Sequence, residues 1–110
     1  MATAFSSIDD RRARRDIVSF RATLDGPAGI RTAVLMVDIS PLGFMSRSSA
    51  PLTPGDIVAV KLPVVGARAA RIVWSVGGRV GGEFIDFISA EQYARLLANA
   101  PHDRPHWNEV

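Results

Sequence analysis

The fold is decided by residues 67–87, which read ARAARIVWSVGGRVGGEFIDF. The first half of this stretch has an apolar residue at every second position: Ala70, Ile72, Trp74 and Val76. That alternation is typical of a half-buried strand and predicts that Trp74 lies in the core. Gly77-Gly78 follows, and a tight hairpin turn requires two residues that tolerate positive φ. Residues 79–87 are then expected to return antiparallel, with Gly81-Gly82 indicating a bulge or close packing.

The residues before this hairpin predict four more strands. From residue 18 onward the sequence alternates, with one face formed by Val18, Phe20, Ala22 and Leu24. Turn or loop residues rich in glycine and proline then separate three further apolar runs, which are residues 30–39, 43–48 and 57–62.

One helix is expected after the last strand. Residues 89–92 have the spacing of a capping box, and Ile88 and Tyr93 are placed as a hydrophobic staple. The apolar residues that follow fall on one helical face, and Pro101 ends the pattern. The chain is therefore assigned to the mainly β class, as a small six-stranded antiparallel barrel with strands in meander order and one C-terminal α-helix.

Length and composition narrow the class of protein. With 110 residues and 47% hydrophobic residues, one packed domain is expected over residues 11–100. Residues 1–10 are expected to form a flexible N-terminal arm, and residues 101–110 a disordered tail. The first residues are too few and too polar for a secretory signal, and no window is apolar enough for a membrane span. We therefore expect a cytoplasmic protein without membrane insertion.

Two polar segments carry the candidate chemistry. Residues 11–15 hold four arginines in five positions, and residues 38–43 read DISPLG. An arginine fork pairs bidentately with phosphate or with the O6/N7 edge of guanine. A carboxylate can accept from guanine N–H groups, a serine can donate to phosphate, and a glycine permits close backbone approach. Together the two segments suggest a guanine nucleotide site.

These motifs resemble the PilZ domain, a bacterial receptor domain for cyclic di-GMP. The resemblance rests on Arg-x-x-x-Arg before the first strand, Asp-x-Ser-x-x-Gly after the second, and residues 71–84, and it covers residues 11–97. It implies a PilZ-like split barrel with ligand-binding residues Arg11, Arg15, Asp38, Ser40 and Gly43. Only Arg11 has an arginine four positions later, which fixes the register and leaves Arg12 and Arg14 as auxiliary phosphate contacts.

The resemblance implies a signalling receptor, with cyclic di-GMP as its ligand and no cofactor. Binding is expected to order the N-terminal arm and so change recognition by a protein effector partner, in a monomer or weak dimer. A second hypothesis is a PilZ-like protein-interaction module that does not bind nucleotide. A third is a nucleic-acid-binding barrel, which the formal net charge of only +2 and the scattered remaining arginines disfavour.

The same residues also have simpler interpretations. The arginine block can be a solvated charged arm, and residues 38–43 an ordinary turn in which Asp38 or Ser40 caps the backbone. His102 and His106 have helical metal-ligand spacing, but the prolines beside them argue against a helix there. There is no cysteine, no histidine near a candidate serine nucleophile, and no carboxylate pair at acid–base spacing. We therefore expect neither a metal site nor an enzyme.

Overall fold

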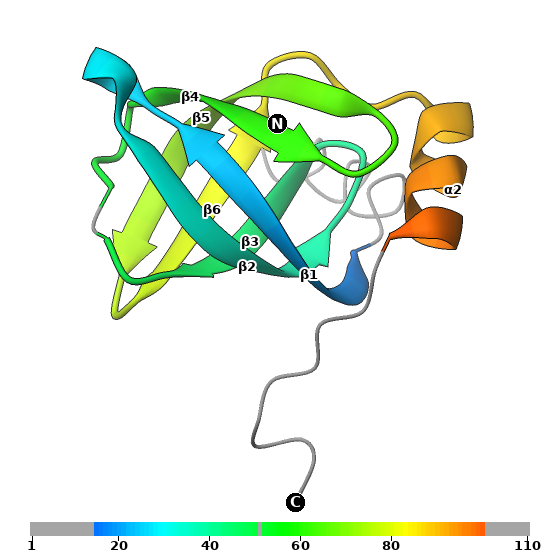
Figure 1. Ribbon diagram of the computed structural model, residues 1–110, viewed down its shortest axis with the longest axis horizontal. Helices are drawn as coiled ribbons and strands as arrows, with labels where there is room; N and C mark the ends of the chain where they lie inside the picture. Colours follow the sequence, from blue (N-terminus) through cyan, green and yellow to red (C-terminus); the bar gives the residue numbers. More distant parts are fainter. Residues whose placement is uncertain (1–14, 51, 101–110) are drawn as a thin grey trace, which may run out of the picture.

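The computed structural model describes residues 15–50 and 52–100. Six strands and one α-helix follow in chain order (Figure 1), with these bounds: β1 (Asp16–Asp25), the short 3-10 helix η1 (Pro27–Gly29), β2 (Arg31–Ile39), β3 (Gly43–Ser48), β4 (Ile57–Leu62), β5 (Gly66–Val76), β6 (Arg79–Phe84) and α2 (Ala90–Asn99). The mainly β assignment is confirmed. The arm predicted for residues 1–10 and the tail predicted for residues 101–110 lie outside the described residues.

The strands close into one antiparallel barrel, in the order β1-β2-β3-β6-β5-β4. The predicted meander order is therefore wrong, because β3 pairs with β6 and β4 pairs with β1. The segment between β3 and β4 carries the chain across the barrel end instead of making a hairpin. Only β1–β2, β2–β3, β4–β5 and β5–β6 are hairpin neighbours.

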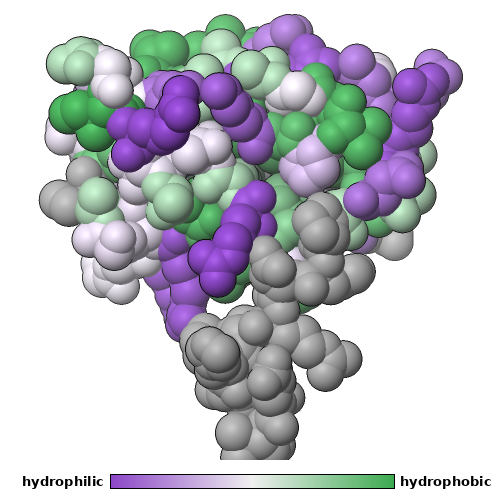
Figure 2. All heavy atoms as spheres, viewed as in Figure 1, coloured by the Kyte–Doolittle hydropathy of each residue, from purple (hydrophilic) through white to green (hydrophobic). Residues whose placement is uncertain are grey.

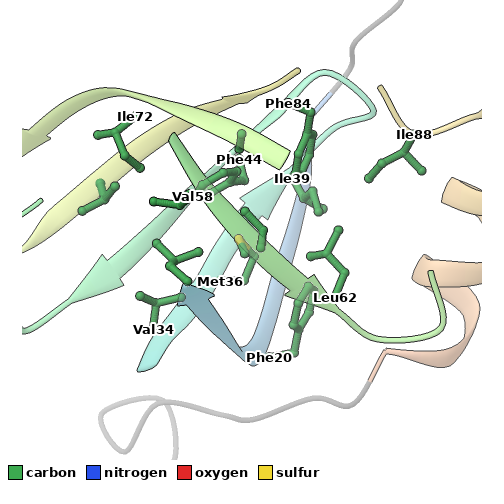
Figure 3. Close-up of a cluster of buried hydrophobic side chains, with 14 of the residues drawn as sticks. Phe20, Val34, Met36, Ile39, Phe44, Val58, Leu62, Ile72, Phe84 and Ile88 are labelled. Carbon is green, nitrogen blue, oxygen red and sulfur yellow. The ribbon is translucent and has the colours of Figure 1, made fainter. Parts of the chain in front are cut away.

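The barrel interior is apolar and closely packed. Side chains from every strand meet there, with Ile88 on the side of α2 (Figure 3), and Leu96 of α2 belongs to the same core cluster. The Phe44 and Phe84 rings lie 5.5 Å apart at their centroids in a tilted arrangement, which is a favourable aromatic geometry. The largest fully buried hydrophobic side chains are Phe20, Phe44, Phe84, Leu24, Met36, Ile39, Ile72, Leu96, Val58, Val60 and Val80.

Bulges or irregularities interrupt the strand register in β1, between Ile17 and Phe20, and in β2 and β5. In β2, Val37 has no partner on β3, since Met36 pairs with Ser46 and Asp38 pairs with Met45. In β5, Val73 is the extra residue between Ile72 and Trp74. An extra residue shifts every following side chain to the opposite face of the sheet. These two positions decide which side chains reach the outer surface near the candidate site.

The last strand is shorter than the sequence predicts, because β6 ends at Phe84 rather than at residue 87. The chain then leaves the ladder, and the Ile88 amide donates to the Pro41 carbonyl at 3.0 Å. Helix α2 begins after Ser89, whose Oγ accepts from the Gln92 amide at 3.1 Å as predicted. The reciprocal half of the capping box is not made, since the Gln92 side chain accepts from Arg68 instead.

Helix α2 lies against one end of the barrel, and the β5–β6 hairpin lies at the other (Figure 1). Leu96 is its buried anchor, and Tyr93 and Leu97 pack beside the core. Within residues 15–50 and 52–100, no helix combines the length and apolar character needed to cross a membrane.

Candidate functional site

Arg15 and Asp38 are brought together at the start of β1 and the end of β2. The Arg15 guanidinium donates from its Nη1 to Asp38 Oδ1 and forms an ion pair with it. Arg15 is 57% exposed at its side chain, whereas Asp38 is only 14% exposed. The two motif residues that the sequence pairs across 23 positions therefore share one surface point. The predicted ligand residue Arg11 and the auxiliary Arg12 and Arg14 lie outside the described residues.

The Val37 bulge places Asp38 on this surface. Val34 and Met36 point into the barrel, so an unbroken alternation would also bury the carboxylate of residue 38. The extra residue instead turns Ile39 inward, where it is fully buried, and leaves Asp38 on the outer face. The outward position of Asp38 thus depends on an irregularity in β2, and a second irregularity lies beside it in β1 between Ile17 and Phe20.

The loop after Asp38 is held by Ser40. Its Oγ accepts from the amides of Leu42 at 3.1 Å and Gly43 at 3.2 Å, and its own amide donates to the Gly43 carbonyl. Ser40 is only 3% exposed, so its main role in this structure is to close the turn. That geometry matches the simpler interpretation of the motif serine, and the predicted phosphate contact has to use the one hydroxyl hydrogen that remains.

Gly43 has a steric role rather than a conformational one. It does not adopt positive φ, but a Cβ at this position would lie 2.6 Å from the Gly82 carbonyl oxygen on the paired strand. No side chain fits there without moving the β6 backbone. Phe84 donates its amide to the Leu42 carbonyl at 2.7 Å, so the loop is fixed to β6 as well.

Behind the ion pair, Tyr93 of α2 connects the helix to both strands. Its hydroxyl lies 2.6 Å from Asp16 Oδ2 and 2.8 Å from the Ile39 carbonyl oxygen, so one hydrogen is shared between two acceptors. Asp16 and Ile39 are paired in the β1–β2 ladder and are the next residues after Arg15 and Asp38. Burial and the Asp16 and Asp38 carboxylates raise the pKa of Tyr93 well above its usual value.

The outer surface beside Asp38 forms a cross-strand row. Asp38 pairs with Ile17 on one side and Met45 on the other, and Met45 pairs with Gly81 of β6. Opposite Gly81 is Trp74, whose ring covers that glycine so closely that a Cβ would lie 2.2 Å from the indole nitrogen. The ring is therefore about two strand spacings, roughly 10 Å, from the Asp38 strand.

Trp74 is not a core residue, and that prediction is wrong. The Val73 bulge turns the side chain outward, where it is 38% exposed and packs one ring face on Gly81. The other predicted feature of this hairpin is confirmed, because Gly81-Gly82 permits close packing by Trp74 and by Phe44. An aromatic face on the outer surface is thus a functional candidate that the sequence alternation concealed.

On the face shown in Figure 2, hydrophilic residues are interleaved with apolar ones. Among the described residues, no group of three or more metal-ligating side chains lies together.

A scan against models of protein families and a search of curated proteins found no match for this chain.

Proposed function

We propose that this protein is a PilZ-like receptor that binds cyclic di-GMP on the outer surface of its barrel, around Arg15 and Asp38. The observation that carries the proposal is the direct contact between these two side chains, which the sequence separates by 22 residues. Guanine presents acceptors at O6 and N7 and donors at N1 and N2. One base can therefore replace both halves of the ion pair, accepting from Arg15 and donating to Asp38.

The surroundings of the pair support a base rather than a bare anion. Ile17 and Met45 flank Asp38 in the same row with apolar side chains. At the end of the row, the outer face of Trp74 is available for stacking, and stacking on an aromatic ring contributes about 1–3 kcal/mol per base. The phosphates of the ligand would then contact the loop that begins at Ser40 and the arginines that precede Arg15.

In this proposal, ligand binding also draws in the segment that carries Arg11. The N-terminal arm would become ordered over the ligand, and a protein effector would recognise the surface that the arm forms with it. This part of the proposal extends a sequence prediction, since these residues lie outside the described part of the chain.

Calorimetric titration with cyclic di-GMP tests the site. Losing a charge-assisted contact costs about 1.5–3 kcal/mol, so Arg15→Ala and Asp38→Ala are each expected to weaken binding at least about tenfold. Arg31→Ala is the matched control, because Arg31 makes a comparable exposed ion pair with Asp25 at the other end of the same two strands. The affinity of Arg31→Ala for cyclic di-GMP should equal that of the wild type.

Two results would overturn the proposal. Equal affinity of the wild type, Arg15→Ala and Asp38→Ala would show that the ligand binds elsewhere. Absence of any heat or thermal shift with the wild type would instead support a protein-interaction module that does not bind nucleotide. The closed Arg15–Asp38 pair, which neutralises itself without a ligand, is the feature that favours this second candidate.

A further inference from the structure

Most of the exposed large hydrophobic side chains come from three neighbouring strands. Residues 15–50 and 52–100 expose nine such side chains, of which only Ile17 and Ile30 belong to the β1–β2 part of the chain. The other seven lie between the start of β4 and the segment that joins β6 to α2: Ile57, Val64, Val73, Trp74, Val76, Ile85 and Phe87. Because β4, β5 and β6 are adjacent in the barrel, and monomeric proteins rarely expose large apolar patches, this side is a candidate interface.

Small side chains lie beside large ones on this side of the barrel. Ala69 of β5 points outward, since the next residue, Ala70, is fully buried in the barrel. Ala67 belongs to the same face two positions earlier and is also exposed. Ile85 follows the buried Phe84 and is 52% exposed, and its amide donates to the Ala69 carbonyl at 2.9 Å. A large outward side chain therefore lies next to the small ones of β5.

The segment that carries Ile85 and Phe87 joins β6 to α2 (Figure 1) and is fixed to both neighbours. Arg68 of β5 donates from Nη1 to Asp86 Oδ2 at 3.0 Å and from Nη2 to the side chain of Gln92 on α2. On either side of Asp86, the Ile85 and Phe87 side chains remain 52% and 58% exposed. A segment that is already held in place loses little conformational freedom when it binds a partner, which favours association.

An ion pair joins the same two strands beside these apolar residues. Arg71 of β5 is the ladder partner of Glu83 of β6, and Arg71 Nη2 lies 3.2 Å from Glu83 Oε1. Both side chains are more than half exposed, at 53% and 55%. The outward residues of β5 are therefore matched by opposites on the neighbouring segment: Ala69 by the large Ile85, and Arg71 by the negative Glu83.

We propose that this face binds a second copy of the chain in a symmetric dimer. A two-fold axis that runs parallel to the strands, between β5 and β6, sets each outward residue opposite its own ladder neighbour from the other copy. Arg71 then meets Glu83 of the other copy, and Ile85 packs on Ala69 of the other copy. Large side chains packed on small ones allow two facing sheets to interdigitate, and the four charges alternate in sign.

The charges favour a second copy over an unrelated partner. A surface that carries a cation and an anion side by side is complementary to itself once it is turned over. Arg71 and Glu83 keep their own contact in the dimer, so no unpaired charge is buried. The interface uses one side of a few strands, and we expect it to bury less than the roughly 1,200 Å² of a standard stable interface. The dissociation constant of the dimer should therefore lie in the micromolar to millimolar range.

This face does not include the Arg15–Asp38 pair. Strand β3 separates β2, which carries Asp38, from β6. Trp74, which covers Gly81, marks the border of the face toward the β5–β6 hairpin. Association is therefore expected without any nucleotide, and Asp38→Ala should associate as strongly as the wild type.

Sedimentation velocity of the full chain without ligand, at concentrations up to the millimolar range, measures the association. Ile85→Asp places a carboxylate at the predicted apolar contact and should weaken association at least about tenfold. Ile30→Asp is the matched control, since Ile30 is 62% exposed but lies between η1 and β2, away from β5 and β6. The dissociation constant of Ile30→Asp should equal that of the wild type.

A charge exchange tests both the partner and the orientation. The face carries two carboxylates in Arg71→Glu and two guanidinium groups in Glu83→Arg, so each variant alone should associate about tenfold or more weakly than the wild type. Mixed in equal amounts, the two variants should form a heterodimer, because every contact between the copies then joins opposite charges. Since Arg71 and Glu83 are more than half exposed, both variants should remain folded, which thermal melting checks.

The proposal fails on any of three results. The first is a wild type that stays monomeric at millimolar concentration, which would leave this face to a different protein. The second is an unchanged dissociation constant in Ile85→Asp, and the third is a mixture of Arg71→Glu and Glu83→Arg that associates no more tightly than each variant alone. None of these results bears on whether Arg15 and Asp38 bind cyclic di-GMP.

Discussion

Replacing Tyr93 with phenylalanine isolates the contact that attaches α2 to the barrel beside the ion pair. The substitution removes only the hydroxyl, so the ring keeps its packing against the core. The variant loses the 2.6 Å hydrogen bond to Asp16 Oδ2 and the 2.8 Å hydrogen bond to the Ile39 carbonyl oxygen. Both acceptors belong to the ladder step that follows Arg15 and Asp38.

The expected magnitude follows from the charge on Asp16. A hydrogen bond to a charged group contributes about 1.5–3 kcal/mol, compared with about 1 kcal/mol between neutral groups. Asp16 is only half-buried, so water can replace part of what is lost and the lower half of that range applies. A domain of 60–100 residues loses about 4–8 °C in melting temperature per kcal/mol, so a fall of at least roughly 6 °C is expected.

Chemical denaturation of four proteins forms the assay: the wild type, Tyr93→Phe, Asp16→Asn and the double variant. If the hydroxyl acts through the carboxylate, the two single effects on the free energy of unfolding should be non-additive by about 1 kcal/mol or more. Additive effects, or a loss below about 0.5 kcal/mol in Tyr93→Phe, would refute the reasoning. The helix would then be held mainly by apolar packing, to which Leu96, Leu97 and the Tyr93 ring contribute.

Further predictions concern ionisation and backbone geometry. Tyr93 is the single tyrosine, and because its pKa is raised in the folded protein, the tyrosine of the unfolded chain ionises first, near pH 10. The stability that the neutral Tyr93 hydroxyl contributes should therefore be complete below that pH and fall above it. Tyrosinate absorbance can follow the ionisation. Gly43→Ala should lower the free energy of unfolding by about 1–3 kcal/mol, because the new Cβ would meet the Gly82 carbonyl oxygen. Gly26→Ala is the control, since a Cβ there would lie 3.6 Å from the nearest atom. Its free energy of unfolding, measured in denaturant, should stay within about 0.5 kcal/mol of the wild-type value. Val64 is 55% exposed and has a φ of 70°, a backbone conformation that is strained for valine and free for glycine. Val64→Gly should therefore not lower the melting temperature, although glycine adds conformational entropy to the unfolded chain. A clearly lower melting temperature would show that the Val64 side chain contributes packing.

Local signals in the sequence were sufficient for most of the secondary structure. The alternation from residue 18 to residue 24 predicted β1, and Gly77-Gly78 predicted the hairpin that follows β5. Ser89 predicted the start of α2, where the observed bond to Gln92 follows from the spacing alone. These features depend on neighbours within a few residues, so the sequence contains their cause directly.

Strand order could not be read in the same way. The pairing of β3 with β6 joins Gly43 to Glu83, 40 residues apart, and no local pattern specifies it. A steric requirement of this pairing is visible only in three dimensions, since a Cβ at Gly43 would lie 2.6 Å from the Gly82 carbonyl oxygen. The glycine of the second motif, expected to permit close backbone approach, therefore allows the close approach of β3 to β6.

The bulges explain the remaining error and the candidate site together. Counting every second residue puts Trp74 and the residue at position 38 inside the barrel, and one extra residue before each places both outside. A signal was present for the first, because Gly81-Gly82 opposite a tryptophan indicates that a ring needs the space. For Asp38 the signal was chemical. An unbroken register would bury its carboxylate inside the barrel, and burying an unpaired carboxylate costs free energy, so this register was already unfavourable.

The Arg15–Asp38 pair also limits which ligands the proposed site can accept. A phosphate could take the place of the carboxylate at Arg15, but it would leave Asp38, only 14% exposed, without a partner beside a second negative charge. Adenine offers no acceptor equivalent to O6 and no N1 donor, so it satisfies neither residue fully. Guanine satisfies both, and because a neutral base then replaces an internal ion pair, this contact should depend little on salt. Selectivity for the base would therefore come from the pair itself, and the salt dependence of binding from the arginines that contact phosphate.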